Sequence, residues 1–390
     1  MSTSHIQPGL LRKMTVRRIL EVLHTHGPAS RAELTRHTGI SAPTVSKAVA
    51  TLMETGLVED DVVDERGMGR PARRVRLATD RTRVVGVVLD SLECIVASAG
   101  LDGLIDADAT VSIRTPSTYK RLIQHVSDTI ADMALGTEAS LLGIGVSIPG
   151  LVNSRTQQAV LSPNLRITNG QFPARDLADR LGCEAIGMQE THALCLAERD
   201  RSRNDPSRDF AMVDATTGLG LGIMTAGKLL LGHGGLAGEL GHITVDINGR
   251  LCGCGNRGCV ETLATDTALA TLVSERLGTT LDFDQVQQLV DCGEVNAAAE
   301  LQQTTDYLAV AIAAAINLLN PSSLCIHARF LNLQDGLFEH LIELIRRRTL
   351  TASFEQCQIR RALGNKQQGA ISAIIHHLTT TLGPLSDEAP

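Results

Sequence analysis

The sequence predicts an N-terminal winged helix-turn-helix domain followed by a larger α/β body of two lobes. Three observations carry this prediction. The region from Thr15 to Val58 has the spacing of short helices joined by tight turns, the sequence changes at Val84 to short β-branched runs, and one histidine and three cysteines lie between Gly241 and Cys259. We therefore expect a DNA-binding domain over residues 1–80 and a body over residues 81–390.

Composition sets limits on the class of protein. The chain has 390 residues and is 43% hydrophobic, but it has no tryptophan and only 2% aromatic residues, so the core must be aliphatic. No apolar run has the length of a membrane span, which is about 18 residues or more. The N-terminal residues lack the apolar segment of a signal peptide. We expect a cytoplasmic protein without membrane contact, in which cysteines serve as metal ligands or buried thiols rather than disulfides.

Charge is distributed unevenly along the chain. The net charge is -7, yet residues 1–83 contain 14 Lys and Arg against 9 Asp and Glu. The remaining residues contain 22 Lys and Arg against 34 Asp and Glu. A basic head on an acidic body indicates that the head binds a polyanion and the body does not.

The head has the pattern of a helix-turn-helix. Apolar residues at helical spacing predict a first helix that ends at Gly27. Ser30 and Glu33 have the capping-box pattern that begins a second short helix. A turn at residues 38–41 then leads to a third helix from about Ala42. The second helix of such a motif enters the major groove of DNA, so the third predicted helix is the recognition helix.

Small polar residues and one cation near the start of the recognition helix suit contacts with base edges and phosphates. The residues expected to face outward and contact DNA are Ala42, Pro43, Thr44, Ser46 and Lys47. A loop rich in Gly, Arg and Pro follows, in the place of a wing. Its arginines are Arg66, Arg70, Arg73, Arg74 and Arg76. Arg70, between Gly69 and Pro71, would fit a minor groove. The alternative is a small protein-interaction domain with a solvated basic loop, but the order of these features favours DNA binding.

The body alternates strands and helices. Short runs from Val84 predict three strands, and helices are expected near 118–135, 171–182 and 190–200. Residues 210–232 have the pattern of a hairpin with a glycine-rich turn, and the chain after Thr267 is mostly helical. This order predicts a mixed sheet in each of two lobes.

A metal site is predicted by the spacing H-x9-C-x-C-x4-C. Three thiolates and an imidazole are the ligand set of a closed, tetrahedral and therefore structural zinc site, with the ligands His242, Cys252, Cys254 and Cys259. The glycines that let the loop curl are Gly253, Gly255 and Gly258. Buried free thiols are the alternative, but packing needs no such glycine spacing. The other six cysteines are interpreted as core residues.

The stretches AGELGHITVD and CGCGNRGCVET closely resemble the signature of the ROK family (repressors, open reading frames and kinases). The head-plus-body layout resembles its branch of xylose-, N-acetylglucosamine- and glucose-responsive repressors. This resemblance covers nearly the whole chain. It implies an actin/hexokinase-like (RNase H-like) ROK body, a structural zinc loop over residues 242–259, and a sugar site beside that loop.

The resemblance also implies the sugar contacts. Glu239, His242 and Glu261 match family residues that bind sugar, and Asn164 is a weaker candidate. Carboxylates accept hydrogen bonds from neighbouring hydroxyls, and a zinc ion would fix the loop that presents them. The alternative is that Glu239 and Glu261 only orient the zinc loop.

Departures from the pattern of the family's sugar kinases argue against phosphoryl transfer. The first phosphate hairpin of the kinases is Asp-x-Gly-x-Thr, whereas residues 90–94 read DSLEC, where an inward leucine or a glutamate would block or repel a triphosphate. Leu221 interrupts the second glycine loop, and residues 322–330 lack the glycine pair of the nucleotide site. Gln189 and Glu190 stand where the kinases have Asn and the catalytic Asp, and they are two further candidates for contact with the ligand. Each side chain is one methylene longer than the kinase residue that it replaces. A hydrogen bond to a ligand tolerates such a displacement better than proton transfer does. The alternative to ligand contact is an ordinary helix start with a favourable carboxylate.

Together these features predict a sugar-responsive DNA-binding regulator and not an enzyme. In this family such a protein is usually a repressor of carbohydrate-use genes, and we expect a homodimer or homotetramer that binds operator DNA. Its effector would be a sugar or sugar phosphate bound in the cleft of the body. Two alternatives are a ligand-independent factor whose body is a dimerisation scaffold or a docking surface for a protein partner, and a sugar kinase with an accessory DNA-binding head. The lost phosphate elements count against the kinase.

Overall fold

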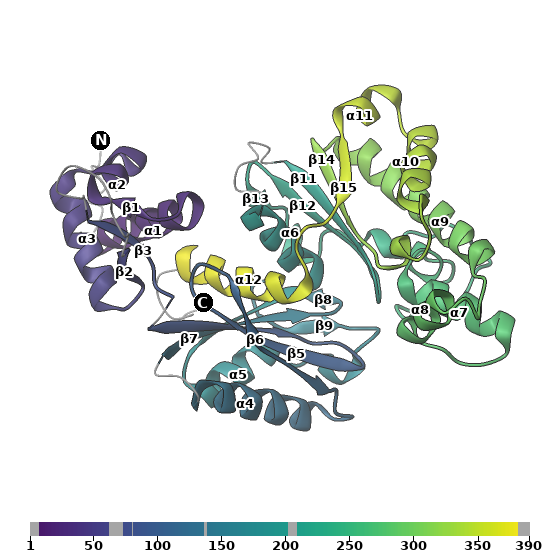
Figure 1. Cartoon of the computed structure of the whole chain (residues 1–390), viewed down its shortest axis with the longest axis horizontal. Coiled ribbons are helices and arrows are strands. Elements are labelled where there is room, and N and C mark those ends of the chain that lie inside the picture. Colours follow the sequence, from purple (N-terminus) through teal and green to yellow (C-terminus); the bar gives the residue numbers. More distant parts are fainter. Residues whose placement is uncertain (1–7, 62–72, 80, 136–138, 202–208, 381–390) are drawn as a thin grey trace. The chain divides into compact units, whose positions relative to one another are not determined.

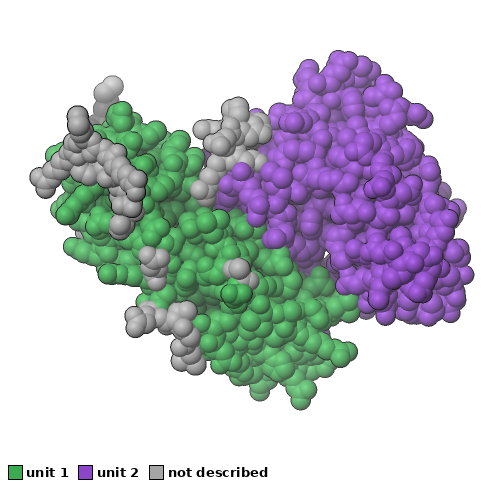
Figure 2. All heavy atoms as spheres, in the orientation of Figure 1, with its two compact units in different colours: residues 1–147, 172–188, 367–390 green, residues 148–171, 189–366 purple. Residues whose placement is uncertain are grey.

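A computed structural model describes residues 8–61, 73–79, 81–135, 139–201 and 209–380. The chain divides into two compact units (Figures 1 and 2). The first unit comprises residues 1–147, 172–188 and 367–390, and the second comprises residues 148–171 and 189–366. The predicted domain boundary near residue 80 lies inside the first unit and stays a prediction.

The N-terminal part of the first unit is a three-helix domain with a small sheet. Its elements are α1 (Pro8–His26), β1 (Ala29–Ser30), α2 (Arg31–Thr38), α3 (Ala42–Glu54), β2 (Val58–Asp61) and β3 (Arg74–Leu77). The strands form an antiparallel sheet of order β1-β3-β2. The three helices pack around fully buried aliphatic side chains, among them Ile19, Leu34 and Val49. This is the arrangement of a winged helix.

The rest of the first unit is a mixed sheet covered by helices. The elements are β4 (Thr82–Val88), β5 (Glu93–Ala99), β6 (Ile105–Arg114), α4 (Tyr119–Leu135), β7 (Ser140–Ile148), α5 (Pro173–Leu181), β10 (Glu184–Gln189) and α12 (Lys366–Thr380). The sheet has the order β10-β7-β4-β5-β6, with β4 parallel to β7 and antiparallel to β5.

The second unit repeats this plan. Its elements are β8 (Leu151–Val152), β9 (Ala159–Leu161), α6 (Glu190–Arg201), β11 (Phe210–Ala215), β12 (Leu219–Thr225), β13 (Lys228–Leu229), α7 (Asp266–Leu277), α8 (Phe283–Asp291), α9 (Ala298–Leu319), β14 (Ser323–His327), α10 (Leu337–Arg348), α11 (Thr351–Gln356) and β15 (Gln358–Arg361). The five-stranded sheet has the order β13-β12-β11-β14-β15. The predicted mixed sheet in each half is confirmed, and the mostly helical C-terminal region also contributes the parallel strands β14 and β15.

Helix α12 packs closely on the sheet of the first unit (Figure 1). Glycines on the two central strands leave room for its backbone. A Cβ atom at Gly145 would lie 1.9 Å from the carbonyl oxygen of Ala370, and one at Gly143 would lie 2.8 Å from Cδ1 of Ile374. The contact at Gly145 is with backbone and excludes any side chain larger than hydrogen, whereas the atom nearest to Gly143 is the end of a flexible side chain. The position of α12 on this sheet is therefore fixed by backbone contact at Gly145.

Among the described residues no helix has the length and apolar character needed to cross a membrane.

We predict that Gly145→Ala destabilises the protein through a steric clash with α12. The added methyl group would overlap the Ala370 carbonyl oxygen, and overpacking of this kind costs about 3 kcal/mol or more. Gly182→Ala is the matched control. Gly182 has a φ of +67°, but a methyl group there would meet nothing within 4 Å, so only backbone strain of about 1 kcal/mol is expected. Equal melting temperatures of the two variants would contradict the prediction.

Candidate functional site

The recognition helix α3 presents its predicted DNA-contacting residues to solvent. Val45, Val49 and Leu52 are buried in the head. The opposite face is exposed, and it carries the five predicted residues Ala42, Pro43, Thr44, Ser46 and Lys47. The helix before it starts with the expected capping box, in which Ser30 Oγ accepts from the Glu33 amide at 3.3 Å and Glu33 Oε2 accepts from the Ser30 amide at 2.8 Å. Gly39, with φ +71°, ends α2 at the turn that leads to α3.

Two of the five wing arginines, Arg74 and Arg76, contact other residues of the winged helix. Arg76 on β3 forms an ion pair with Glu59 on β2 at 2.9 Å. Arg74 donates a hydrogen bond to the carbonyl oxygen of Pro28 at the turn before α2. Both side chains therefore stabilise the hairpin, and both lie on its strand β3 rather than in its loop. Arg70 and Arg66 lie outside the described residues.

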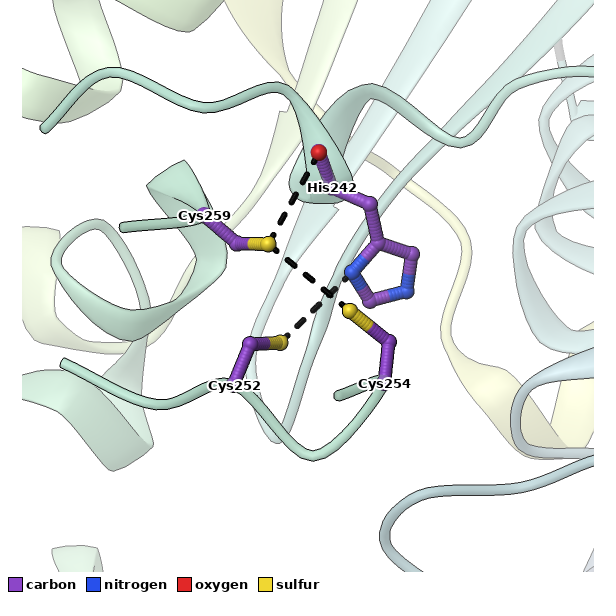
Figure 3. Close-up of side chains that lie close together, drawn as sticks. All are labelled: His242, Cys252, Cys254 and Cys259. Carbon is purple, nitrogen blue, oxygen red and sulfur yellow. Dashed lines mark hydrogen bonds between the residues drawn. The ribbon is translucent and has the colours of Figure 1, made fainter. Parts of the chain in front are cut away.

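The predicted metal ligands converge in the second unit (Figure 3). The ligand atoms of His242, Cys252, Cys254 and Cys259 all lie within 4.8 Å of one another. The sulfur atoms of Cys254 and Cys259 are 3.7 Å apart, and the Cys252 sulfur is 3.7 Å from Nδ1 of His242. Zn–S bonds of about 2.3 Å in a tetrahedron place two sulfur atoms about 3.8 Å apart. The spacing of the donors and their chemistry both fit a zinc ion.

Tight turns bring these ligands together. The Cys252 amide donates to the carbonyl oxygen of Asn256 at 2.7 Å, which closes the loop between the cysteines. Gly258 has a φ of +66°, and a Cβ atom there would lie 1.5 Å from the Asp246 carbonyl oxygen. A glycine is therefore required just before Cys259. Burial raises the pKa of the Cys252 and Cys259 thiols, so a cation is needed to hold them as thiolates at neutral pH.

Predicted sugar-contacting residues lie on both sides of this cluster. Glu239 Oε2 lies 3.6 Å from Nε2 of His242, whose other ring nitrogen faces Cys252. Gln189, at the end of β10, donates from Nε2 to Glu239 Oε1 at 2.9 Å. Glu261 lies on the other side, with Oε1 3.6 Å from the Cys252 sulfur. We call Gln189, Glu239, His242 and Glu261 the acidic wall.

Asn164 lies beside the acidic wall. A Cβ atom at Gly218 would be 2.9 Å from Glu261 Oε2 and 3.5 Å from Nδ2 of Asn164, so these three residues are neighbours. Burial raises the pKa of Glu239. The Gln189 side chain is 6% exposed, and its Oε1 has no hydrogen-bond partner among the described residues. A buried amide oxygen without a donor is costly, which makes this wall suited to a ligand that brings hydroxyl or amide hydrogens.

Glu190, the first residue of α6, is engaged in a different set of contacts. Its Oε1 forms an ion pair with Lys366 Nζ at 3.0 Å, and the same ammonium lies 3.7 Å from Asp214 Oδ2. Asp214 also binds Nδ1 of His327 at 2.8 Å and the Thr216 hydroxyl at 3.0 Å. Burial alone would raise the pKa of Asp214, but Lys366 and His327 lower it below its ordinary value. Burial alone would lower the pKa of His327, but the Asp214 carboxylate raises it. A Glu190 carboxylate held by an ammonium is a poor general base.

The glycine loop at residues 217–222, whose counterpart in the kinases binds phosphate, makes contacts within the protein in this chain. Glu261 Oε2 accepts from the Leu219 amide at 3.0 Å, so a carboxylate occupies this backbone donor. A Cβ atom at Gly220 would lie 2.2 Å from the Thr191 hydroxyl, and one at Gly222 would lie 2.4 Å from the Cys195 sulfur. These two glycines therefore allow β12 to pack on α6. In the first hairpin, Leu92 is 62% exposed and is not part of the core of its unit.

Sequence reasoning missed the Lys366 contacts. Lys366, Asp214 and His327 come from three distant segments, and none of them belongs to a motif with recognisable spacing. Lys366 stands among other polar residues, including Asn365 and Gln367, so nothing in the sequence distinguishes a buried ion pair from a solvated lysine.

Comparison with known proteins agrees with this geometry. Residues 90–378 match the model of the ROK family, and residues 13–67 match the model of the MarR family. The xylose repressor of Bacillus subtilis (strain 168) is 28% identical over 80% of this chain and 81% of its own length. The DNA-binding transcriptional dual regulator NagC of Escherichia coli (strain K12) is 25% identical over 81% of this chain and 80% of its own length.

Solved structures show the same fold. The structure of a ROK family transcriptional regulator, described as a homologue of the E. coli MLC protein, superposes with a TM-score of 0.78 at 23% identity and covers 95% of this chain and 97% of that one. A ROK hexokinase from Thermus thermophilus has a TM-score of 0.61 at 24% identity and covers 76% of this chain and 98% of its own, so it lacks a counterpart for about a quarter of this chain. The body thus has the actin/hexokinase-like fold and the head is a winged helix. Because the matching family model spans most of the sequence, the chain belongs to the ROK family.

Proposed function

We propose that the protein is a sugar-responsive transcriptional repressor rather than a sugar kinase. The observation that carries the proposal is the combination, in one chain, of a winged helix with an exposed recognition face and a ROK body whose phosphate-loop amide at Leu219 is occupied by Glu261. Such a body can bind a sugar but has lost a donor that a triphosphate would need. Relatives named "Xylose repressor" and "N-acetylglucosamine repressor" support the same function.

In this proposal α3 enters the major groove. Ala42, Pro43 and Thr44 approach base edges near the helix start, while Ser46 and Lys47 bind phosphates. Arg70 of the wing would reach the minor groove. The protein would act in the cytoplasm as a dimer or tetramer, because two heads are needed to read two operator half-sites.

A structural zinc ion would be held by His242, Cys252, Cys254 and Cys259. Four protein ligands leave no open position, so the ion would fix the loop and take no part in chemistry. Sugar hydroxyls would bind the acidic wall, with Asn164 at its edge and Glu190 within reach of the same ligand. The Nε2 side of His242 faces Glu239, so the ion would also set the orientation of the wall.

Zinc binding is tested with Cys254→Ser. We expect about one zinc ion per wild-type chain and almost none in the variant, because three remaining ligands bind zinc far more weakly. The melting temperature of the variant should also fall. Cys292→Ser, at an exposed cysteine, is the control and should keep the metal. Wild-type protein that contains no metal after purification and zinc dialysis, measured by plasma mass spectrometry, would contradict the site.

DNA contact is tested with Lys47→Ala on an operator selected from random-sequence DNA. Loss of one phosphate contact should weaken binding and reduce the slope of log affinity against log salt by about 1. Lys228→Ala removes an exposed lysine from the second unit and should change neither quantity. A Lys47→Ala protein with unchanged affinity and salt slope would remove this residue from the interface.

Sugar binding is tested by thermal shift with D-xylose, D-glucose, N-acetylglucosamine, its 6-phosphate and ATP. A ligand that binds only the folded state raises the melting temperature by mass action, so we expect a shift with at least one sugar and none with ATP. Glu239→Ala should abolish the shift, while Glu355→Gln at an exposed position should keep it. An ATP shift without a sugar shift would favour a kinase-like nucleotide site, and no shift at all would favour a ligand-independent scaffold.

A further inference from the structure

The segment from Ala362 to Lys366 is fixed to α6 at two points. Toward the C-terminal end of α6, Glu198 is fully buried and accepts from the amides of Leu363 at 2.9 Å and Gly364 at 3.2 Å. A Cβ atom at Gly364 would lie 2.9 Å from Cβ of Ala197, so the segment lies directly against the helix. At the first residue of α6, the Glu190 carboxylate binds Lys366. Leu363 and Gly364 are therefore held against the C-terminal part of the helix by their backbone, whereas Lys366 contacts its first residue through a side-chain ion pair.

Lys366 occupies a junction in the chain. It is the last residue of the second unit and the first residue of α12, whose remaining residues belong to the first unit. Its side chain is 14% exposed and lies between two carboxylates, at 3.0 Å from Glu190 and 3.7 Å from Asp214. The ammonium is thus nearer to Glu190 than to Asp214, and Asp214 is close enough to bind it more tightly if the Glu190 contact weakens.

Helix α12 in turn is part of the core that includes the winged helix. Its backbone is held against the sheet of the first unit by Gly145, and Ile371, Ile374 and Ile375 belong to one cluster of buried apolar side chains with Val75 and Leu77 of the winged helix. A shift at the start of α12 would therefore act on side chains packed with the DNA-binding domain, because close-packed cores transmit strain.

We propose that Lys366 is a positioning residue that couples sugar binding to the DNA-binding domain, an inference that rests on the proposed function. Gln189 and Glu190 are adjacent in sequence at the end of β10 and the start of α6. A sugar hydroxyl that donates to Glu190 competes with Lys366 for this carboxylate. The ammonium then moves toward Asp214, and the first turn of α12 moves with it. The sugar-bound state thus differs from the free state in the contacts of one lysine. A ligand can shift a conformational equilibrium only if it binds the two states with different free energies, and this change of contacts would provide the difference.

The test measures operator affinity with and without the sugar that raises the wild-type melting temperature. Allosteric ratios of this kind are about 5- to 150-fold. Lys366→Met should still show a sugar-induced rise in melting temperature, but its affinity ratio should fall to about 1. Lys366→Arg keeps the charge and should keep most of the ratio. Lys120→Met removes an exposed lysine from the first turn of another helix, α4, and should keep the wild-type ratio.

The outcomes separate the inference from the proposed function. A Lys366→Met protein with the wild-type ratio would overturn the role of Lys366 and leave the sugar-responsive repressor intact. A wild-type protein that binds operator but neither binds nor responds to any sugar would overturn the proposed function, and this coupling with it. If Lys366→Met does not fold, hydrogen exchange on the wild-type protein decides. Sugar should change the exchange of backbone amides in residues 366–375, and unchanged exchange there would overturn the coupling.

Discussion

The convergence of one histidine and three cysteines is the constraint on which the acidic wall depends. Residues 243–259 contain turns and isolated bridges rather than strands or helices. Backbone hydrogen bonds hold these turns, among them those from the Cys252 amide to the Asn256 carbonyl and from the Gly258 amide to the Arg250 carbonyl. These turns bring the four ligand atoms within 4.8 Å of one another. Glu239 precedes the first ligand by three residues and Glu261 follows the last by two. The positions of both carboxylates therefore follow from the geometry of the cluster.

A protein named as a transcriptional regulator and another named as a hexokinase share this fold. A kinase needs free backbone donors for phosphate and a free carboxylate as base. In this chain the Leu219 amide is bound by Glu261, and the Glu190 carboxylate is bound by Lys366. The amide and the carboxylate that phosphoryl transfer would need are thus both bound by other residues of the protein. The acidic wall still presents oxygen atoms that can accept hydrogen bonds from hydroxyl groups. The contacts of Leu219 and Glu190 argue against phosphoryl transfer, which tolerates displaced groups less well than ligand binding does.

Local patterns in the sequence predicted what depends on local chemistry. The capping box at Ser30, the turn at Gly39 and the spacing of the four metal ligands each place a residue relative to near neighbours in the chain, and the structure contains all three features. The resemblance to the ROK family made both Gln189 and Glu239 candidate ligand contacts, and the structure shows that these two side chains, 50 positions apart, are hydrogen-bonded. Long-range pairings outside any motif were not predictable, as with Arg76 and Glu59 in the wing or Lys366 and Glu190, because an ion pair leaves no periodic signal in either segment.

In this account, a sugar bound by the second unit changes the affinity of the winged helix for DNA. The most direct measurement is the dissociation constant of the zinc-loaded, full-length protein for its selected operator, with and without a saturating sugar identified by thermal shift. We predict specific binding in the free state and an affinity weakened by about fivefold or more in the sugar-bound state. A sugar that binds the protein but leaves the operator affinity unchanged would contradict the claim.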